Sequence, residues 1–224
     1  WRSRDEFRQL SGREDIVVIP NGFDDADFPP DQRGPLDEDF TIVHIGSMNK
    51  DRNPEVFWKA TQQALEESTE LRSKLKIRLV GPVDFSVRSS VENFGLQPYT
   101  EFIEFIPHDQ AVKLQQQSQV NLLVINNSPN SRTIIPGKLY EYLGSGRPLL
   151  GVGPKDSDSA KVIELTKGGV VHDYDDSEGL KKRILEYFAH YKEGKLNGNA
   201  EGTQQFTRRY LAGEYAKLLD TLVK

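Results

Sequence analysis

Cysteine is absent from this chain of 224 residues, and its four histidines stand far apart. Without thiols the chain forms no disulfide bonds and no thiolate metal sites, and no pair of histidines has the spacing of zinc ligands. Aspartates that would bridge a magnesium ion to a phosphate are not clustered either. We therefore expect no metal ion and no other cofactor.

The sequence also lacks a basic stripe and a long apolar run. Acidic and basic residues are interspersed and the formal net charge is −5, whereas a nucleic-acid partner requires clustered cations. No apolar stretch approaches the roughly 20 residues that span a bilayer, and the polar first residues are no signal peptide. We expect a soluble chain that binds no nucleic acid. It lacks an initiator methionine and opens with what looks like the end of a helix, at 5–10, which indicates a piece of a longer protein.

What the chain has is a regular alternation of short apolar runs with longer amphipathic segments. Ile, Val and Leu fill the short runs, as is typical of strands that crossover helices bury on both faces. Strands are expected at 41–45, 76–80, 103–105, 120–124, 148–152 and 169–171. Helices are expected at 54–68, 84–94, 109–116, 137–143, 158–165 and 177–191. The pattern predicts an α/β, Rossmann-like fold with a doubly wound parallel six-stranded sheet.

The predicted domain organisation has three parts. Residues 1–20 form the remnant of an interdomain tail or linker, 21–200 form the Rossmann-like domain, and 201–224 form a C-terminal helix. The polar, glycine-rich run 192–202 indicates a linker or exposed loop. The last helix starts near residue 203 and carries an apolar stripe, which we expect to pack on this domain or to cross to a domain outside the chain.

The segment 134–150 is the most informative part of the sequence, because it joins a loop, a short helix and a buried strand. Pro136 and Gly137 end the loop, and Gly137 allows close approach of a ligand to the backbone. The unpaired N–H groups and the dipole at the helix start attract phosphate, and Lys138 adds positive charge. One turn further, the carboxylate of Glu141 suits two ribose hydroxyls. The pairing suggests a nucleoside diphosphate; the structural alternative is a turn glycine followed by a solvated Lys and Glu.

Other loops are expected at the same sheet edge, where ligands of such folds bind. After the first strand, Gly46 permits close approach, and Lys50 or Arg52 can meet a phosphate. We prefer Arg52, because it precedes a helix start. His108, after the third strand, is either a ligand contact or a simple helix cap. The loop 126–133 either shapes a sugar pocket or is an irregular excursion.

Several motifs resemble the C-terminal, donor-binding domain of GT-B glycosyltransferases, in particular the retaining family 4 (glycosyl transferases group 1). They are Val-Ile-Pro-Asn-Gly-Phe-Asp at 18–24, Val-His-Ile-Gly at 43–46, Leu-Val-Gly at 79–81 and Pro-Gly-Lys-Leu-Tyr-Glu-Tyr-Leu-Gly-Ser-Gly-Arg-Pro at 136–148. The last motif is the most specific. The resemblance spans most of the chain and implies one half of a GT-B fold.

By this resemblance, Glu141 matches the second acid of the family's paired-glutamate motif and holds the donor ribose. The N–H groups around Lys138 and Leu139 would bind the diphosphate, Arg52 would neutralise it, and the main chain near Phe105 and Ile106 would recognise the base. The implied catalytic residues are Arg52, Lys138 and Glu141. The implied donor-binding residues are Gly46, Ser47, Lys50, Phe105, Ile106, Thr133, Ile134, Pro136, Gly137 and Leu139.

Two positions depart from the family pattern. The first acid of the motif, expected eight residues before Glu141, is Thr133, and the arginine often found after the first strand's glycine is Ser47. Lys138, Lys50 or Ser47 are candidates to compensate. Both departures concern contacts to the sugar.

The resemblance implies a bacterial hexosyltransferase of polysaccharide or glycoconjugate synthesis. It would move a sugar from a nucleotide-sugar donor to a saccharide or lipid-linked acceptor with retention, and a helix start with cations would stabilise the leaving diphosphate without a metal. The acceptor site belongs to an N-terminal domain that the chain lacks, so the chain alone is expected to bind nucleotide weakly and to transfer little sugar. The whole protein is expected in the cytoplasm, with peripheral association at the inner membrane.

Two other functions fit the same features. A nucleotide-sugar epimerase would bind the same ligand, but it needs ionisable groups that remove a proton from the sugar, and only His108 and a few acids are candidates. A non-catalytic module, either a degenerate transferase domain or an interaction domain, is favoured by Thr133 in place of the acid.

Overall fold

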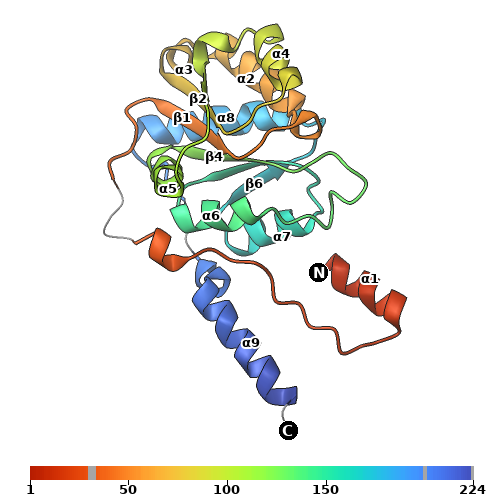
Figure 1. The fold of residues 1–224 in the computed structure, drawn as a ribbon. Coiled ribbons are helices and arrows are strands. Elements are labelled where there is room, and N and C mark those ends of the chain that lie inside the picture. Colours follow the sequence, from red (N-terminus) through yellow and green to blue (C-terminus); the bar gives the residue numbers. More distant parts are fainter. Residues whose placement is uncertain (30–33, 199–200, 223–224) are drawn as a thin grey trace.

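The computed structural model describes residues 1–29, 34–198 and 201–222, and its centre is one parallel sheet (Figure 1). The six strands are β1 Phe40–Ile45, β2 Leu75–Val80, β3 Thr100–Ile103, β4 Val120–Val124, β5 Leu149–Val152 and β6 Gly169–His172. They lie in the order β3-β2-β1-β4-β5-β6, so the strand order reverses between β1 and β4. The doubly wound α/β fold predicted from the sequence is confirmed.

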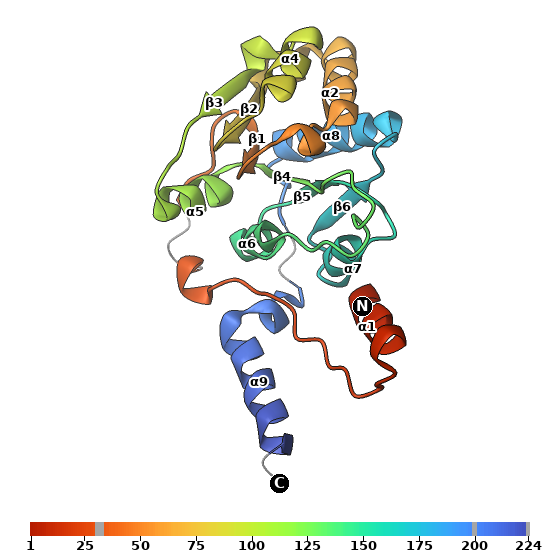
Figure 2. The same ribbon diagram turned by 45° about the vertical axis from the view of Figure 1, so that its right-hand side comes forward.

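Helices cover both faces of the sheet (Figure 2). One face carries α2 Glu55–Glu67, α3 Thr69–Lys74, α4 Phe85–Asn93 and α8 Ser177–Lys192, and the other carries α5 His108–Gln117, α6 Gly137–Ser145 and α7 Asp158–Leu165. This cover explains why the strands are apolar at consecutive positions, since every residue of β1 and β4 is buried.

The larger core cluster fills the α2 and α8 side of the sheet. Phe40 and Ile42 of β1 belong to it, and Trp58 of α2 is a fully buried member. The Trp58 ring meets Phe57 edge to face with centroids 5.1 Å apart, and its indole N–H donates to Asn53 Oδ1 at 2.8 Å. A second cluster packs α6 and α7 against β4 and β5 on the opposite side.

Most elements lie where the sequence predicts them, but the third strand does not. The sequence predicts 103–105, whereas β3 is Thr100–Ile103, because its pairing with β2 ends at Val80↔Ile103. Apolar and polar residues alternate in 103–105 but not in Thr100–Ile103, where Phe102 and Ile103 are adjacent, so the pattern favours the wrong segment; the end of β2 decides the placement. Phe105 consequently lies beyond the strand, with 87% of its surface exposed. The short helix α3 is also missing from the prediction.

The run 192–202 is less of an exposed linker than its composition predicts. Residues 199–200 lie outside the described residues, but Leu196 is buried against the larger core. Its carbonyl accepts a hydrogen bond from the Arg147 guanidinium at 3.0 Å. A 3-10 turn at Thr203–Phe206 follows, and the last helix, α9 Arg208–Leu222, begins later than expected.

The helix α9 points away from the sheet (Figures 1 and 2). Leu211 is buried at its base, whereas Tyr215, Leu219 and Leu222 are more than half exposed, so its apolar stripe packs only in part on this domain. At the other terminus, α1 Arg2–Ser11 bonds to the start of α7. Within the described residues, none of the helices combines the length and the apolar character that crossing a bilayer requires.

Candidate functional site

The strands β1 and β4, between which the order reverses, pair over a short stretch. Their register consists of Ile42↔Val120 and Val43↔Asn121, whereas β1 pairs with β2 along its whole length. The backbone ladder between β1 and β4 therefore ends two residues before β1 does. Ligands of open parallel sheets bind at such a reversal, and the candidate site is built around it.

Side chains satisfy the backbone groups that this ladder leaves unpaired. His44 Nδ1 donates to Leu122 O at 3.0 Å, and the Ile45 N–H donates to the Tyr142 hydroxyl at 2.8 Å. Both side chains are buried. Burial lowers the pKa of His44 to about 4 and raises the pKa of Tyr142, so both rings are neutral at pH 7. Through Tyr142, the helix α6 is fastened to the end of β1.

The loops after β1 and β2 leave the sheet through glycines. Gly46 and Gly81 have φ angles of +133° and +115°, which residues with side chains rarely adopt. A Cβ on Gly81 would lie 2.9 Å from Gly46 O, so the two turns pack backbone against backbone. A Cβ on Gly46, in contrast, would meet no described atom within 4 Å. Gly46 therefore faces open space, as close approach of a ligand requires.

Arg52 connects the loop after β1 to the loop after β4. It ends the 3-10 turn Lys50–Arg52, and its guanidinium donates through Nε to Asn126 Oδ1 and through NH1 to Ser47 O at 3.3 Å. These two acceptors hold the cation at the strand reversal.

The surroundings of Lys50 differ from those of Arg52. It lines a cavity of about 440 Å³ together with Asn53, Ser86 and Tyr174, on the α2 side of the sheet edge. No residue of α6 is among the described residues that line this cavity. The two basic residues that the sequence offers as alternatives thus face different surroundings.

The start of α6 provides unpaired backbone donors. Pro136 precedes the helix without a side-chain cap, and the Leu139 N–H donates to Pro136 O at 3.0 Å. Among the described residues, the amides left unpaired at this helix start are therefore those of Gly137 and Lys138. They lie one residue earlier than the resemblance implies, and the Leu139 side chain is buried in the core.

Glu141 lies one turn into α6, and two side chains donate to its Oε2 atom. They are Lys138 Nζ at 2.6 Å and Gln115 Nε2 at 3.1 Å. The side chains of Lys138 and Glu141 are 32% and 25% exposed, so this ion pair is partly shielded from water. Helical side chains lean toward the helix N-terminus, which directs the Glu141 carboxylate toward the unpaired amides. A cation, a carboxylate and a helix start therefore meet at this place.

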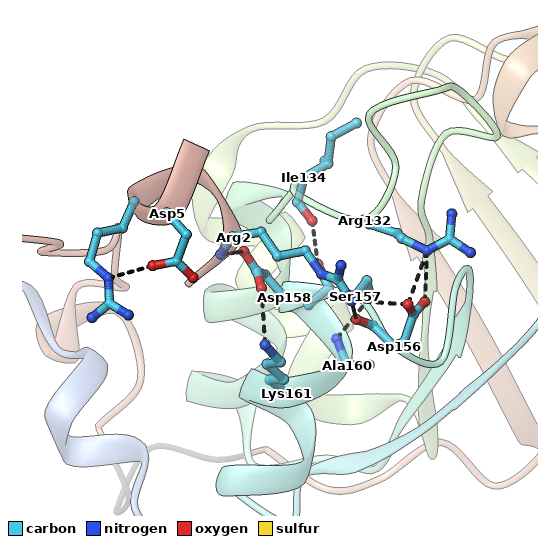
Figure 3. Close-up of polar contacts among 11 residues, drawn as sticks. Arg2, Asp5, Arg132, Ile134, Asp156, Ser157, Asp158, Ala160 and Lys161 are labelled. Carbon is cyan, nitrogen blue, oxygen red and sulfur yellow. Dashed lines mark hydrogen bonds and ion pairs between the residues drawn. The ribbon is translucent and has the colours of Figure 1, made fainter. Parts of the chain in front are cut away.

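The loop before α6 is fixed on the start of α7 (Figure 3). The Ser159 hydroxyl donates to Ile134 O at 2.7 Å, and Arg132 Nε donates to both Asp156 oxygens at 3.0 Å. The Arg2 guanidinium of α1 binds the same carboxylate at 2.9 Å. These bonds hold the backbone that leads into α6.

Thr133, which stands where the family pattern has an acid, takes part in a turn within this loop. Its N–H and its hydroxyl both donate to Asn130 O at 3.0 Å. The hydroxyl is thus engaged in local structure.

The loop after β3 reaches the same edge from the side. Ile106 packs against the small buried cluster of Val43, Ile45, Val80 and Ala111, which lies at the ends of β1 and β2. His108 Nε2 lies 3.0 Å from Asp27 Oδ2, so this histidine bonds to the segment that precedes the sheet.

The structure thus groups the predicted residues into sets: Gly46, Ser47 and Arg52 after β1, Gly137, Lys138 and Glu141 in α6, and Phe105 and Ile106 after β3. Lys50 lines its own cavity, and Thr133 and Ile134 form the approach to α6. Sequence reasoning missed Gln115 and Tyr142, and it named Asn126 only as a member of the loop 126–133; the signal for Gln115 was a polar residue on the inward face of α5. No group of three or more histidines and acids close enough to hold a metal ion is found in the described part of the chain.

No family model and no curated protein matches the sequence. Solved structures do match. A glycosyltransferase from Rickettsia africae is 15% identical, with a TM-score of 0.76 over 99% of this chain and 62% of that one. Anabaena HepE in complex with UDP-glucose is 18% identical, with a TM-score of 0.72 over 98% of this chain and 61% of that one. The pneumococcal O-GlcNAc transferase GtfA in complex with UDP and GlcNAc is 16% identical, with a TM-score of 0.70 over 99% and 44%.

These matches show the fold. The chain has the Rossmann-like architecture found in GT-B glycosyltransferases, as its sequence motifs suggest. It spans 44% to 62% of the length of these three proteins.

Proposed function

We propose that this chain is the donor-binding part of a retaining glycosyltransferase, which moves a sugar from a nucleotide sugar to a saccharide or glycoconjugate acceptor. The observation that carries the proposal is the place of Glu141. Its carboxylate lies beside Lys138 and the start of α6, next to the strand reversal of a GT-B-like sheet. The complexes of similarly folded proteins with UDP and UDP-glucose support the choice of ligand.

Each part of a nucleoside diphosphate has a partner in this arrangement. Glu141 would accept hydrogen bonds from the ribose hydroxyls, and the Gly137 and Lys138 amides would donate to the diphosphate. Backbone groups after β3 would recognise the base. Arg52, held by Asn126 and Ser47, would supply positive charge from the opposite side.

The chemical task of these groups is to stabilise the diphosphate as it leaves the sugar. Negative charge develops on the leaving oxygen, and donors fixed in advance stabilise that charge without reorganisation. Arg52 is held by two hydrogen bonds, and α6 is fixed to β1 through Tyr142. We assign the charge stabilisation to these two elements together with Lys138.

Calorimetric titration with UDP, GDP and ADP tests the binding role. We expect one of the three to bind, and Glu141→Ala to weaken that binding by about 1.5–3 kcal/mol, as for a lost hydrogen bond to a charged group. Glu164→Ala, at an exposed acid of α7, is the control and should leave binding unchanged. If none of the nucleotides binds, or if Glu141→Ala binds as well as the wild type, the assignment of this site is wrong.

The second expectation concerns transfer. Because the chain spans only part of the length of similar glycosyltransferases, we expect the 224-residue chain to bind donor nucleotide but to transfer little or no sugar. Product formation from radiolabelled UDP-glucose or UDP-GlcNAc with a mixture of saccharide acceptors measures this. Sustained turnover by the chain alone would contradict the view that acceptor binding needs a further domain.

A further inference from the structure

We infer that Gln115 is a positioning residue for donor recognition, whose buried carboxamide holds Glu141 in the orientation that accepts the ribose hydroxyls. The inference rests on the proposed function, since it assumes that Glu141 meets a ribose. It adds a residue that neither the motifs nor the family resemblance assigns.

Gln115 occupies an unusual place for a polar side chain. It lies near the end of α5 and is fully buried between this helix and α6. A buried carboxamide is unfavourable unless it is hydrogen-bonded, and an apolar side chain of similar size would fill the same space without that cost. Among the described residues, the side chain has one hydrogen-bond partner, Glu141, to which its Nε2 donates at 3.1 Å. The carboxylate of Glu141 thus accounts for an amide at this position.

The hydrogen bonds to Glu141 are unevenly divided between its two oxygens. Gln115 and Lys138 both donate to Oε2, and no described residue bonds to Oε1. A carboxylate oxygen accepts about two hydrogen bonds, so Oε2 is occupied and Oε1 remains for a ligand. Fixing Oε2 fixes the plane of the carboxylate, and with it the direction of Oε1.

The two donors on Oε2 differ in what a diphosphate does to them. Lys138 is charged and 32% exposed, so a bound diphosphate attracts its ammonium away from Glu141. Gln115 is neutral and buried and has no such competing partner. When a donor binds, Gln115 therefore keeps the carboxylate in place while Lys138 turns to the phosphates.

A buried polar chain fixes the position of Gln115 itself. Asn121 Nδ2 donates to the main-chain carbonyl of Gln115 at 3.3 Å and to Ser145 Oγ at 2.9 Å, and Ser145 Oγ donates to Tyr142 O at 2.6 Å. The end of α5 is thereby tied through β4 to the helix that carries Glu141.

The test compares Gln115→Met with the wild type. It measures the affinity of UDP, GDP and ADP and of their 2′,3′-dideoxy analogues by calorimetry. The wild type should prefer the ribonucleotide, and Gln115→Met should reduce this preference by about tenfold, the value of a lost hydrogen bond to a charged group. The affinity for the dideoxy nucleotide should change less than about twofold, because it does not use Oε1. General damage to the site would instead weaken both nucleotides equally.

Gln116→Met is the matched control, because Gln116 is also buried on α5 but does not bond to Glu141. It should leave the preference for ribose unchanged. If Gln115→Met fails to fold, Gln115→Leu, which also removes the donor and has a smaller side chain, should show the same loss of preference. An unchanged preference in the Gln115 variants overturns the inference while the proposed function stands. No binding of any nucleotide by the wild type overturns both.

Discussion

Lowering the pH from 8 to 4 is expected to reduce the free energy of unfolding by about 3 kcal/mol through His44 alone. Burial lowers the pKa of this imidazole to about 4, against 6.5 in an unfolded chain, and the nearby charges of Arg52 and Lys138 act in the same direction. The hydrogen bond to Leu122 O opposes them only in part. Because the unfolded chain binds this proton more tightly, stability is complete above about pH 7 and is lost as the pH falls from 6.5 toward 4.

Urea denaturation at pH 8, 6, 5 and 4 measures this effect. In His44→Gln, which lacks the titrating ring but retains an N–H donor, the pH dependence should be smaller by about 3 kcal/mol. His190→Gln, at an exposed histidine of α8, should follow the wild type. A His44→Gln variant with the same pH dependence as the wild type would show that His44 is not buried in its neutral form.

Replacing Trp58 by alanine is expected to cost about 3–5 kcal/mol of stability. The side chain is fully buried in the larger core, so its removal leaves a cavity there. It also takes the indole donor from Asn53, the residue that directly follows Arg52. Chemical denaturation at pH 8 gives the change, and Phe85→Ala, at an aromatic residue of α4 that is 81% exposed, should stay within about 0.5 kcal/mol. A loss near 1 kcal/mol for Trp58→Ala would contradict the packing described here.

The fold could be predicted because its strands are buried on both sides. Runs that are mostly apolar, such as β4 with Asn121 as its one polar residue, leave a strong signal, and α7 Asp158–Leu165 lies where the sequence places it. The hydrophobic pattern fails to predict the structure where the burial of a residue depends on residues far away in the sequence. Thr100–Ile103 is chosen over 103–105 by the end of β2. Leu196 is buried although polar and glycine residues surround it in the sequence.

In the candidate site, too, contacts within one helix could be predicted from the sequence, whereas contacts between distant segments could not. Lys138 and Glu141 are three residues apart on one helix, so their proximity follows from helical geometry. The contacts of Gln115 with Glu141 and of Arg52 with Asn126 join residues that are 26 and 74 positions apart. Such pairs are set by how α5 packs on α6 and how two loops meet above the sheet, which no local pattern contains.

The short pairing between β1 and β4 has a mechanical consequence. Twisting β1, β2 and β3 as a block against β4, β5 and β6 strains two ladder pairs, the two hydrogen bonds between Thr41 and Gln119, and the side-chain bonds of His44 and Tyr142, whereas bending either block strains four or more ladder pairs. The boundary between β1 and β4 thus has the fewest ladder pairs in the sheet, so the least resistance to twisting is expected there. A molecule that binds to the loops on both sides of this boundary would restrict the twisting. Slower exchange of the Ile45 amide hydrogen with solvent would report that restriction.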